Sequence, residues 1–192
     1  MECFYFHGSQ CEKVKVLEQC QLSPPPGSAP PTSLPLSFLD IPWFYCVPES
    51  YFYEFPHSSN HFLETVLPNL KHSLSLTLQH FFPFTGNLVF PPKPQFPYIH
   101  YIHENSISFT IAESTAEFPL LIANTATDKE DGTWLFPLIA DGRAFYRFIK
   151  FWTSYVTKTK CDVASSSQAL LPLLNRDIIE DPKGLKLILW KE

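Results

Sequence analysis

Residues 63–89 read LETVLPNLKHSLSLTLQHFFPFTGNLV, and this stretch decides the fold. Apolar side chains recur in it at the 3, 4, 7 spacing that one buried helical face requires, and they are Leu63, Val66, Leu67, Leu70, Leu74 and Leu78. Pro68 falls where one short helix ends and another begins, because proline is tolerated in the first turn. The spacing therefore predicts two consecutive helical pieces.

Signals on either side of this stretch predict both strands and helices. Alternation of apolar and polar side chains predicts strands at Val14–Leu22 and Ile107–Ile111, and an aromatic run predicts another at Tyr51–Phe55. A second amphipathic helix is predicted over Phe145–Val156, preceded by Asp141, a good cap residue. We therefore expect an α/β fold, with a mixed sheet flanked by helices.

Proline is concentrated in two windows of the chain. Nine of the 19 prolines lie between Pro24 and Pro56, and five lie between Pro83 and Pro97. Since proline fixes φ and lacks an amide hydrogen, both windows are predicted to be extended or turning. The run from Pro24 to Pro35 has the composition of a polyproline ligand for an SH3-type partner, but a loop joining the first strand to the core is favoured.

Composition excludes several classes of protein. The 192 residues are 45% hydrophobic and 16% aromatic, which is enough apolar surface for a core. The net charge of −5 argues against nucleic acid or an anionic membrane as a partner. No apolar run approaches the roughly 18 residues of a membrane span. Five scattered cysteines without a C-x-x-C pair favour a reducing compartment, so we expect a cytoplasmic protein.

Six segments resemble, in order, the N-terminal half of the plant BAHD acyltransferases. Four are VKV (14–16, with Gln19 and Cys20), LSFLDIPW (36–43), LTLQHFFPFTGNL (76–88) and ADGRAF (140–145). Two more, YFYEFP (51–56) and AESTA (112–116), bring the chain closer to the branch that malonylates anthocyanin and phenolic glucosides. The resemblance implies a chloramphenicol-acetyltransferase-like domain, acyl-CoA as co-substrate and a phenolic glucoside as acceptor, with no bound cofactor or metal.

The resemblance also implies a catalytic motif, which this sequence does not preserve. Family members carry H-x-x-x-D-G, in which the histidine takes the acceptor's proton and the aspartate holds the local structure. Histidine suits this role because its pKa lies near neutrality. Here Asp141 and Gly142 are present, but Pro137 stands at the histidine position. Proline cannot take a proton, so we expect no intact catalytic residue, and Asp141 is expected to act as a helix cap.

The departure from the family extends beyond one residue. The family-like segment Ile122–Thr125 is followed by the turn-like run Thr127–Gly132, which leaves no room for the connection and strand that deliver the histidine. We therefore expect an internal deletion near residues 128–137. Residues 1–12 are expected to form a non-family extension, and residues 13–192 a partial N-terminal acyltransferase-like domain. The C-terminal domain is expected to be absent.

No other histidine is an evident replacement. The seven are His7, His57, His61, His72, His80, His100 and His103. We expect His80 to stabilise a helix C-terminus as a cation, and His100 and His103 to point to opposite faces of a strand. His57 and His61 share a helical face at i, i+4, but no third metal ligand accompanies them.

Three hypotheses follow for function. The first is an active acyltransferase, which Pro137 and the missing half oppose. The second is a non-catalytic module that docks on a full-length homologue through the surface that would face the second domain. The third is a truncated gene product without a role.

Overall fold

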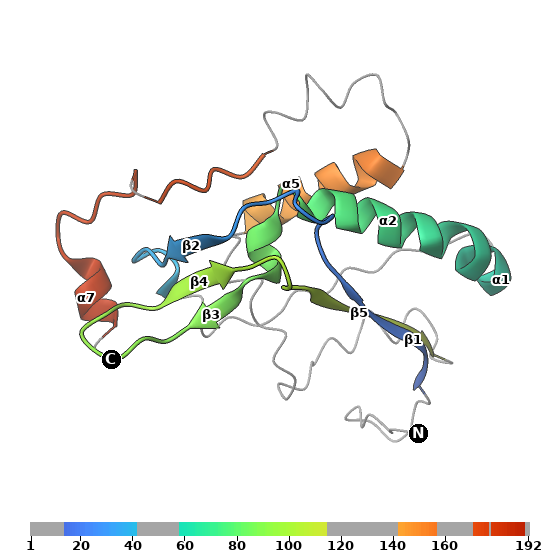
Figure 1. Cartoon of the computed structure of the whole chain (residues 1–192), viewed down its shortest axis with the longest axis horizontal. Coiled ribbons are helices and arrows are strands. Elements are labelled where there is room, and N and C mark those ends of the chain that lie inside the picture. Colours follow the sequence, from blue (N-terminus) through green and yellow to red (C-terminus); the bar gives the residue numbers. More distant parts are fainter. Residues whose placement is uncertain (1–13, 42–57, 115–141, 157–170, 177, 191–192) are drawn as a thin grey trace.

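The computed structural model describes residues 14–41, 58–114, 142–156, 171–176 and 178–190. In these residues a helical layer lies against two small sheets, and a C-terminal segment runs past the three-stranded sheet to the short helix α7 (Leu185–Leu189) (Figure 1). The expected combination of strands and helices is confirmed. The predicted strand Tyr51–Phe55 lies outside the described residues.

A continuous helical run forms where the leucine spacing predicts it. It consists of α1 (Ser59–His61), the π-helical turn η2 (Phe62–Val66) and α2 (Leu67–Leu78). The Ser58 hydroxyl caps its start by accepting from the backbone N–H of His61 at 3.4 Å. Pro68 lies in the first turn of α2, as predicted, because its missing N–H has no helical partner there. The run begins four residues earlier than the leucine pattern indicates.

The strands form two antiparallel sheets in the described residues, where we expected one mixed sheet. One pairs β1 (Val14–Leu22) with β5 (Ile107–Ser114), which confirms both predicted strands. The other has the order β2-β4-β3, made of β2 (Thr32–Pro35), β4 (Tyr98–Tyr101) and β3 (Asn87–Val89). Both proline windows therefore contain strands as well as loops. Pro35 is accommodated because it is the last residue of β2.

The alternation seen in the first strand does not bury one face along its whole length. The register shifts between Val16 and Glu18, which is the mark of a β-bulge. Val16 is 53% exposed, whereas Cys20 and Leu22 beyond the bulge are partly buried. The sequence period of two continues through this strand, but the bulge changes which side chains face the core.

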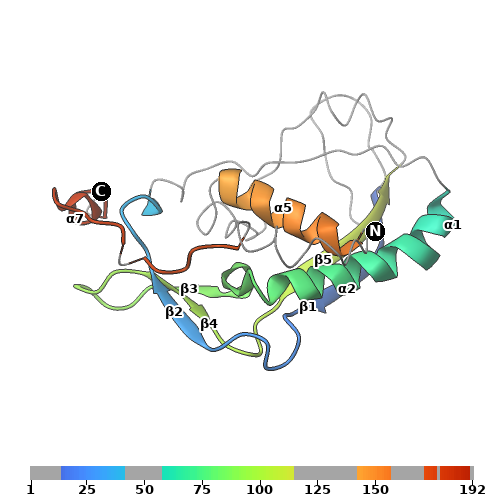
Figure 2. The same cartoon turned by 90° about the horizontal axis from the view of Figure 1, so that it is seen from above.

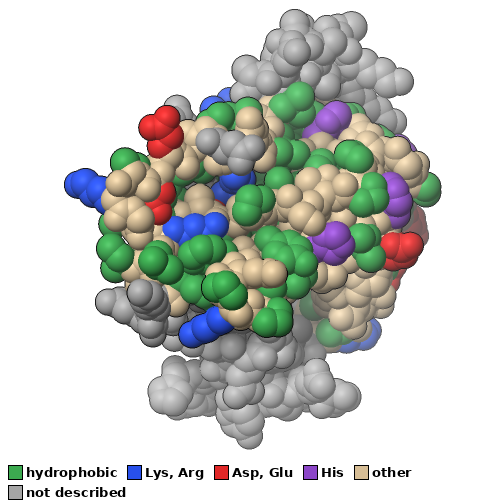
Figure 3. Space-filling model, turned by 60° about the vertical axis from the view of Figure 1, so that its left-hand side comes forward, with side chains coloured by type: hydrophobic (Ala, Val, Ile, Leu, Met, Phe, Trp, Pro, Cys, Tyr) green, Lys and Arg blue, Asp and Glu red, His purple; other side chains and the backbone are tan. Residues whose placement is uncertain are grey.

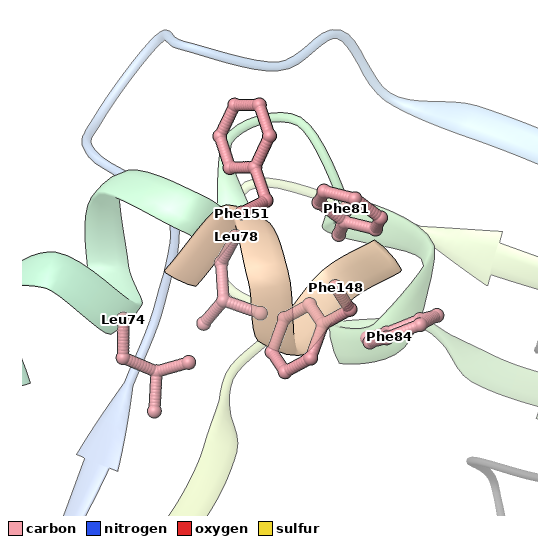
Figure 4. Close-up of a cluster of buried hydrophobic side chains, with 6 residues drawn as sticks. All are labelled: Leu74, Leu78, Phe81, Phe84, Phe148 and Phe151. Atoms are coloured by element: carbon pink, nitrogen blue, oxygen red, sulfur yellow. The ribbon is translucent and has the colours of Figure 1, made fainter. Parts of the chain in front are cut away.

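The main core lies between α2 and α5 (Gly142–Val156), which run side by side (Figure 2). Its buried side chains are Leu74, Leu78, Phe81, Phe84, Phe148 and Phe151. Phe148 contacts Phe81 and Phe84 with ring centroids 5.4 and 5.0 Å apart. Figure 4 shows these three rings together at one end of the cluster and Leu74 at the other. Phenylalanine therefore supplies most of the core volume.

A short turn that carries Phe81 and Phe84 joins α2 to strand β3. After Leu78 the chain turns through Phe81 into the 3-10 helix η3 (Phe82–Thr85) and then into β3. Gly86 makes this turn possible, because a Cβ there would lie 2.7 Å from the Ile99 side chain. The short path brings Phe81 and Phe84 under α5.

Candidate functional site

The first turn of α5 carries what is left of the expected motif. Gly142 is the first residue of this helix, while Asp141 and Pro137 lie outside the described residues. The predicted helix is therefore present, and its start coincides with the Asp-Gly pair. The expected capping role of Asp141 stays a prediction.

A cavity of about 120 Å³ lies beside the first half of α5. Four parts of the chain line it: α5, the turn around η3, strand β2 and the segment 172–176. The lining residues are Leu34, Phe81, Pro83, Phe84, Ala144, Arg147, Pro172, Leu173, Leu174 and Arg176. The walls are therefore mostly apolar, and two arginines are among the lining residues.

One of these guanidinium groups is paired with a buried carboxylate. Arg176 Nη1 donates to Asp40 Oδ1 at 2.7 Å and to Asp40 Oδ2 at 2.6 Å. The backbone N–H and the hydroxyl of Ser37 also donate to Asp40 Oδ2, each at 2.6 Å. Both charged side chains are largely buried, with 16% exposed for Arg176 and 11% for Asp40. This pair attaches the C-terminal segment to the loop after β2.

Lys186 in α7 lies close to the same carboxylate. Burial lowers the pKa of its amine, and the negative charges of Asp40 and Asp181 partly offset this effect. Its Nζ lies 4.5 Å from the centre of the Phe96 ring, which is cation–π contact. Asp181 caps α7 by accepting from the backbone N–H groups of Leu185 and Lys186.

The second arginine that lines the cavity, Arg147, differs from Arg176. In the part of the chain that the structure describes, the ion pairs are Lys71 with Glu18 and Arg176 with Asp40. Arg147 takes part in neither.

The histidines that the structure describes do not line this cavity. His61 and His72 are exposed on the helical run, and His7 and His57 lie outside the described residues. His100 is in β4, with its Nδ1 2.9 Å from the Ser33 hydroxyl. The expectation for His103 was wrong, because β4 ends at Tyr101 and His103 lies in the following turn.

His80 follows the end of α2, where burial opposes the cationic role that we expected for it. Burial lowers the pKa of its imidazole, which favours the neutral ring. The Gln79 amide nitrogen lies 2.9 Å from His80 Nε2, within hydrogen-bond distance. The ring also packs edge-on against Phe151, with centroids 5.1 Å apart.

Tyr101 is a further described residue whose pKa is shifted by its surroundings. Burial, and secondarily the negative charge of Glu104, raises the pKa of Tyr101 above its usual range. Within the described ranges no three histidine, cysteine or acidic side chains gather as a metal site would require. No described helix is long and apolar enough to cross a membrane.

The lining of the cavity combines phenylalanine, aliphatic and proline side chains with two arginines, and none of the lining residues is a histidine or carboxylate that takes a proton from an alcohol. The nearby carboxylate of Asp40 already accepts hydrogen bonds from the Ser37 N–H, the Ser37 hydroxyl and Arg176. General base catalysis therefore has no candidate among the cavity's lining residues.

Most of the chain matches the model of one known protein family. Residues 14–162 match the family described as the Transferase family, which makes the α/β fold around α5 a transferase-type domain. The chain belongs to this family, the BAHD acyltransferases.

Curated relatives cover most of this chain but less than half of their own length. A coumaroyl-CoA:anthocyanidin 3-O-glucoside-6''-O-coumaroyltransferase of Arabidopsis thaliana is 34% identical over 88% of this chain and 45% of the relative. A malonyl-coenzyme A:anthocyanin 3-O-glucoside-6''-O-malonyltransferase of Dahlia pinnata is 45% identical over 65% and 28%. A malonyltransferase of Salvia splendens, acting on anthocyanin 5-O-glucoside, is 32% identical over 92% and 47%. The chain spans about half the length of the curated relatives it matches.

Sequence reasoning missed the ion pair of Asp40 and Arg176. A signal existed, because Asp40 is a lone acid in the apolar segment LSFLDIPW, and such an acid needs a partner when it is buried. Nothing in the sequence points to Arg176, which lies 136 positions away. Arg147 was also missed, because the helix that contains it was predicted from its apolar residues alone.

Proposed function

We propose that this chain derives from an acyl-CoA-dependent acyltransferase acting on anthocyanin or phenolic glucosides, and that its 192 residues do not catalyse the transfer. The printed activities of the relatives support the first part. Pro137, at the position of the family's histidine, supports the second. Since a proline side chain cannot accept a proton, acyl transfer lacks its base.

The lengths of the alignments support an internal deletion. The match to the Arabidopsis relative runs over 211 positions, yet it uses 88% of a 192-residue chain, or about 169 residues. About 42 positions of the relative therefore have no counterpart here. The Salvia relative gives the same result, with 219 positions against 92% of the chain. We place this gap near residues 128–137, within a partial domain that covers residues 13–192.

An activity assay tests the proposal. Purified protein is incubated with malonyl-CoA or coumaroyl-CoA and an anthocyanidin 3-O-glucoside, and products are separated by chromatography. We expect no product above the blank, while a full-length relative supplies the positive control. Turnover that disappears when a single histidine is replaced would overturn the proposal. Genomic DNA between the codons for Asp128 and Pro137 gives an independent check, because a splice product leaves the missing family segment encoded there.

A second candidate function is docking on a full-length homologue. Large apolar side chains of the C-terminal segment and α7 are exposed, including Leu173, Ile178, Leu187 and Ile188. Figure 3 shows the face that carries this end of the molecule, with hydrophobic side chains interspersed among lysine and arginine. Co-purification with a full-length homologue is the expected result, and a monodisperse monomer in its presence counts against docking.

We also propose a cytoplasmic location. Five scattered cysteines without a C-x-x-C pair support a reducing compartment. A fluorescent fusion imaged in plant cells tests this, and accumulation in the secretory pathway contradicts it.

A further inference from the structure

The C-terminal segment, residues 171–176 and 178–190, runs past the three-stranded sheet to α7, and we call it the strap (Figure 1). We propose that the strap is a detachable cover, which opens as one unit from the apolar face of this sheet and is latched by the ion pair of Arg176 with Asp40. This inference rests on neither proposed function, because it uses neither the catalytic motif nor a partner protein.

The strap covers part of an apolar sheet face. The strand register places Leu34 of β2 and Leu88 of β3 on either side of Ile99 of β4, so the three side chains form a row on one face. Leu174 of the strap packs against this row and also against a second cluster that contains Phe82 and Tyr101. Removing the strap therefore uncovers the edge of two small apolar clusters.

The strap carries its own backbone hydrogen bonds. The N–H groups of Ile179, Gly184 and Trp190 donate to carbonyl oxygens of other strap residues at 3.1, 3.2 and 3.1 Å. These bonds need not break when the strap leaves the sheet. None of the strap residues that the structure describes is buried. Segments with so few buried contacts open at a lower free energy than the core does.

Side chains at both ends of the strap hold it to the rest of the chain. The ion pair lies at the first end, and its two side chains are 16% and 11% exposed. At the other end Lys186 lies 4.5 Å from the centre of the Phe96 ring, and Trp190 stacks on Phe90, which is 60% exposed. Since water reaches these aromatic contacts, the ion pair is the better shielded attachment. It is therefore the contact that we assign as the latch.

The two halves of the latch belong to different parts of the structure. Ser37 donates to Asp40 from its N–H and its hydroxyl, so the carboxylate stays on the loop after β2, whereas Arg176 moves with the strap. Opening hydrates both charges. If the arginine alone is removed, the closed strap still covers a carboxylate without its counter-charge, which favours the open form.

Hydrogen exchange of the unaltered protein, followed by NMR, tests the opening itself. The hydrogen-bonded amides of the strap are expected to share one protection factor, at least about tenfold below those of the slowest amides in α2 and α5. Equal protection in the strap and these helices means that the strap opens only when the whole protein unfolds. Strap amides with widely different protection factors indicate fraying. Either result overturns the proposal, and neither depends on a variant that folds.

Two variants test the latch. Arg176→Met is expected to raise the exchange rate of the strap on the order of 100-fold, because the closed form then keeps an unpaired buried carboxylate. Lys183→Met removes the same charge from an exposed position of the strap, and it is expected to change the rate less than twofold. Equal effects of the two variants overturn the role of the ion pair.

A thiol under the strap reports whether opening uncovers the sheet. Leu34→Cys replaces a side chain that is 8% exposed and lies in the apolar row that Leu174 covers. Alkylation by iodoacetamide, located by mass spectrometry of the peptide, is expected to accelerate when Arg176→Met is added, by about the factor found for the strap amides. An unchanged alkylation rate beside faster exchange of the strap overturns its role as a cover.

Discussion

Arg176→Met is expected to lower the free energy of unfolding by about 3 kcal/mol. The change removes the guanidinium and keeps most of the aliphatic stem, so it isolates the charge. Removing one partner of a buried ion pair costs about 3–5 kcal/mol, because the other charge stays buried and uncompensated. Asp40 retains its two hydrogen bonds from Ser37 at 2.6 Å, which places the expected cost at the low end of that range.

The matched control is Lys71→Met. Lys71 forms the other ion pair of the described residues, with Glu18, whose side chain is 44% exposed. Solvent screens such a pair, so its loss is expected to cost less than about 1 kcal/mol. The two variants remove the same charge, and they differ in the burial of the partner.

Urea denaturation measures both variants, with tryptophan fluorescence and far-UV circular dichroism as probes. Trp152 reports on the helical core, because its indole N–H donates to the Ser73 hydroxyl at 2.9 Å. In thermal unfolding, 3 kcal/mol corresponds to a decrease in Tm of about 6–12 °C for a chain of this length.

A double-mutant cycle completes the test. The double variant Asp40→Asn with Arg176→Met is expected to lose much less than the sum of the two single losses, because neither charge is left unpaired. The reasoning is refuted by additive losses, or by an Arg176→Met variant no less stable than Lys71→Met.

Three further predictions concern the core and its neighbours. Phe148→Ala is expected to lower the free energy of unfolding by about 3–5 kcal/mol, because it removes a ring from the centre of the cluster. Tyr146→Ala, on the exposed side of the same helix, is expected to lower it by less than about 0.5 kcal/mol, and urea denaturation measures both losses. Gly86→Ala is expected to cost about 1–3 kcal/mol, because its Cβ would lie 2.7 Å from the buried Ile99 side chain, and an unchanged unfolding midpoint contradicts this close contact. Burial lowers the pKa of His80 from its usual value of 6.5, so the stability that the neutral ring contributes is present above pH 6.5 and is lost as the pH falls through the lowered pKa. His80→Gln is therefore expected to lose less stability than the native chain between about pH 7 and pH 5, measured by urea denaturation at each pH. Parallel pH profiles of the two proteins refute a lowered pKa at His80.

The helices were predictable from sequence because their signals are local. Leucines at the spacing of one face fix α2, and Pro68 marks its first turn by removing an amide that has no partner. For α5 the helical spacing picks out Phe145, Phe148, Ile149, Trp152 and Val156 as the apolar face. That face includes the buried Phe148 but not Phe151, which is buried as well. Which side chain of a wide apolar face lies deepest depends on the helix packed against it, and here His80 and Phe81 of the neighbouring segment cover Phe151.

The short strands and the ion pair were not predictable, for a different reason. Strands β2 and β3 have four and three residues, too few for a period of two to be seen. Their existence depends on β4 lying between them. Asp40 and Arg176 meet only because the C-terminal segment returns to the loop after β2, and no sequence spacing encodes such a return.

The long separation between Asp40 and Arg176 has a consequence for how the chain folds as it is synthesised. At about 5–20 residues per second, the 136 positions between them take on the order of 10 s to translate. Leu78 and Phe81 are made early in that interval, whereas α5, which packs against the rings, begins 61 positions after Phe81, and Arg176 follows only after α5. The nascent chain therefore exposes aromatic surface until α5 has emerged, and we expect chaperones to bind it during this period.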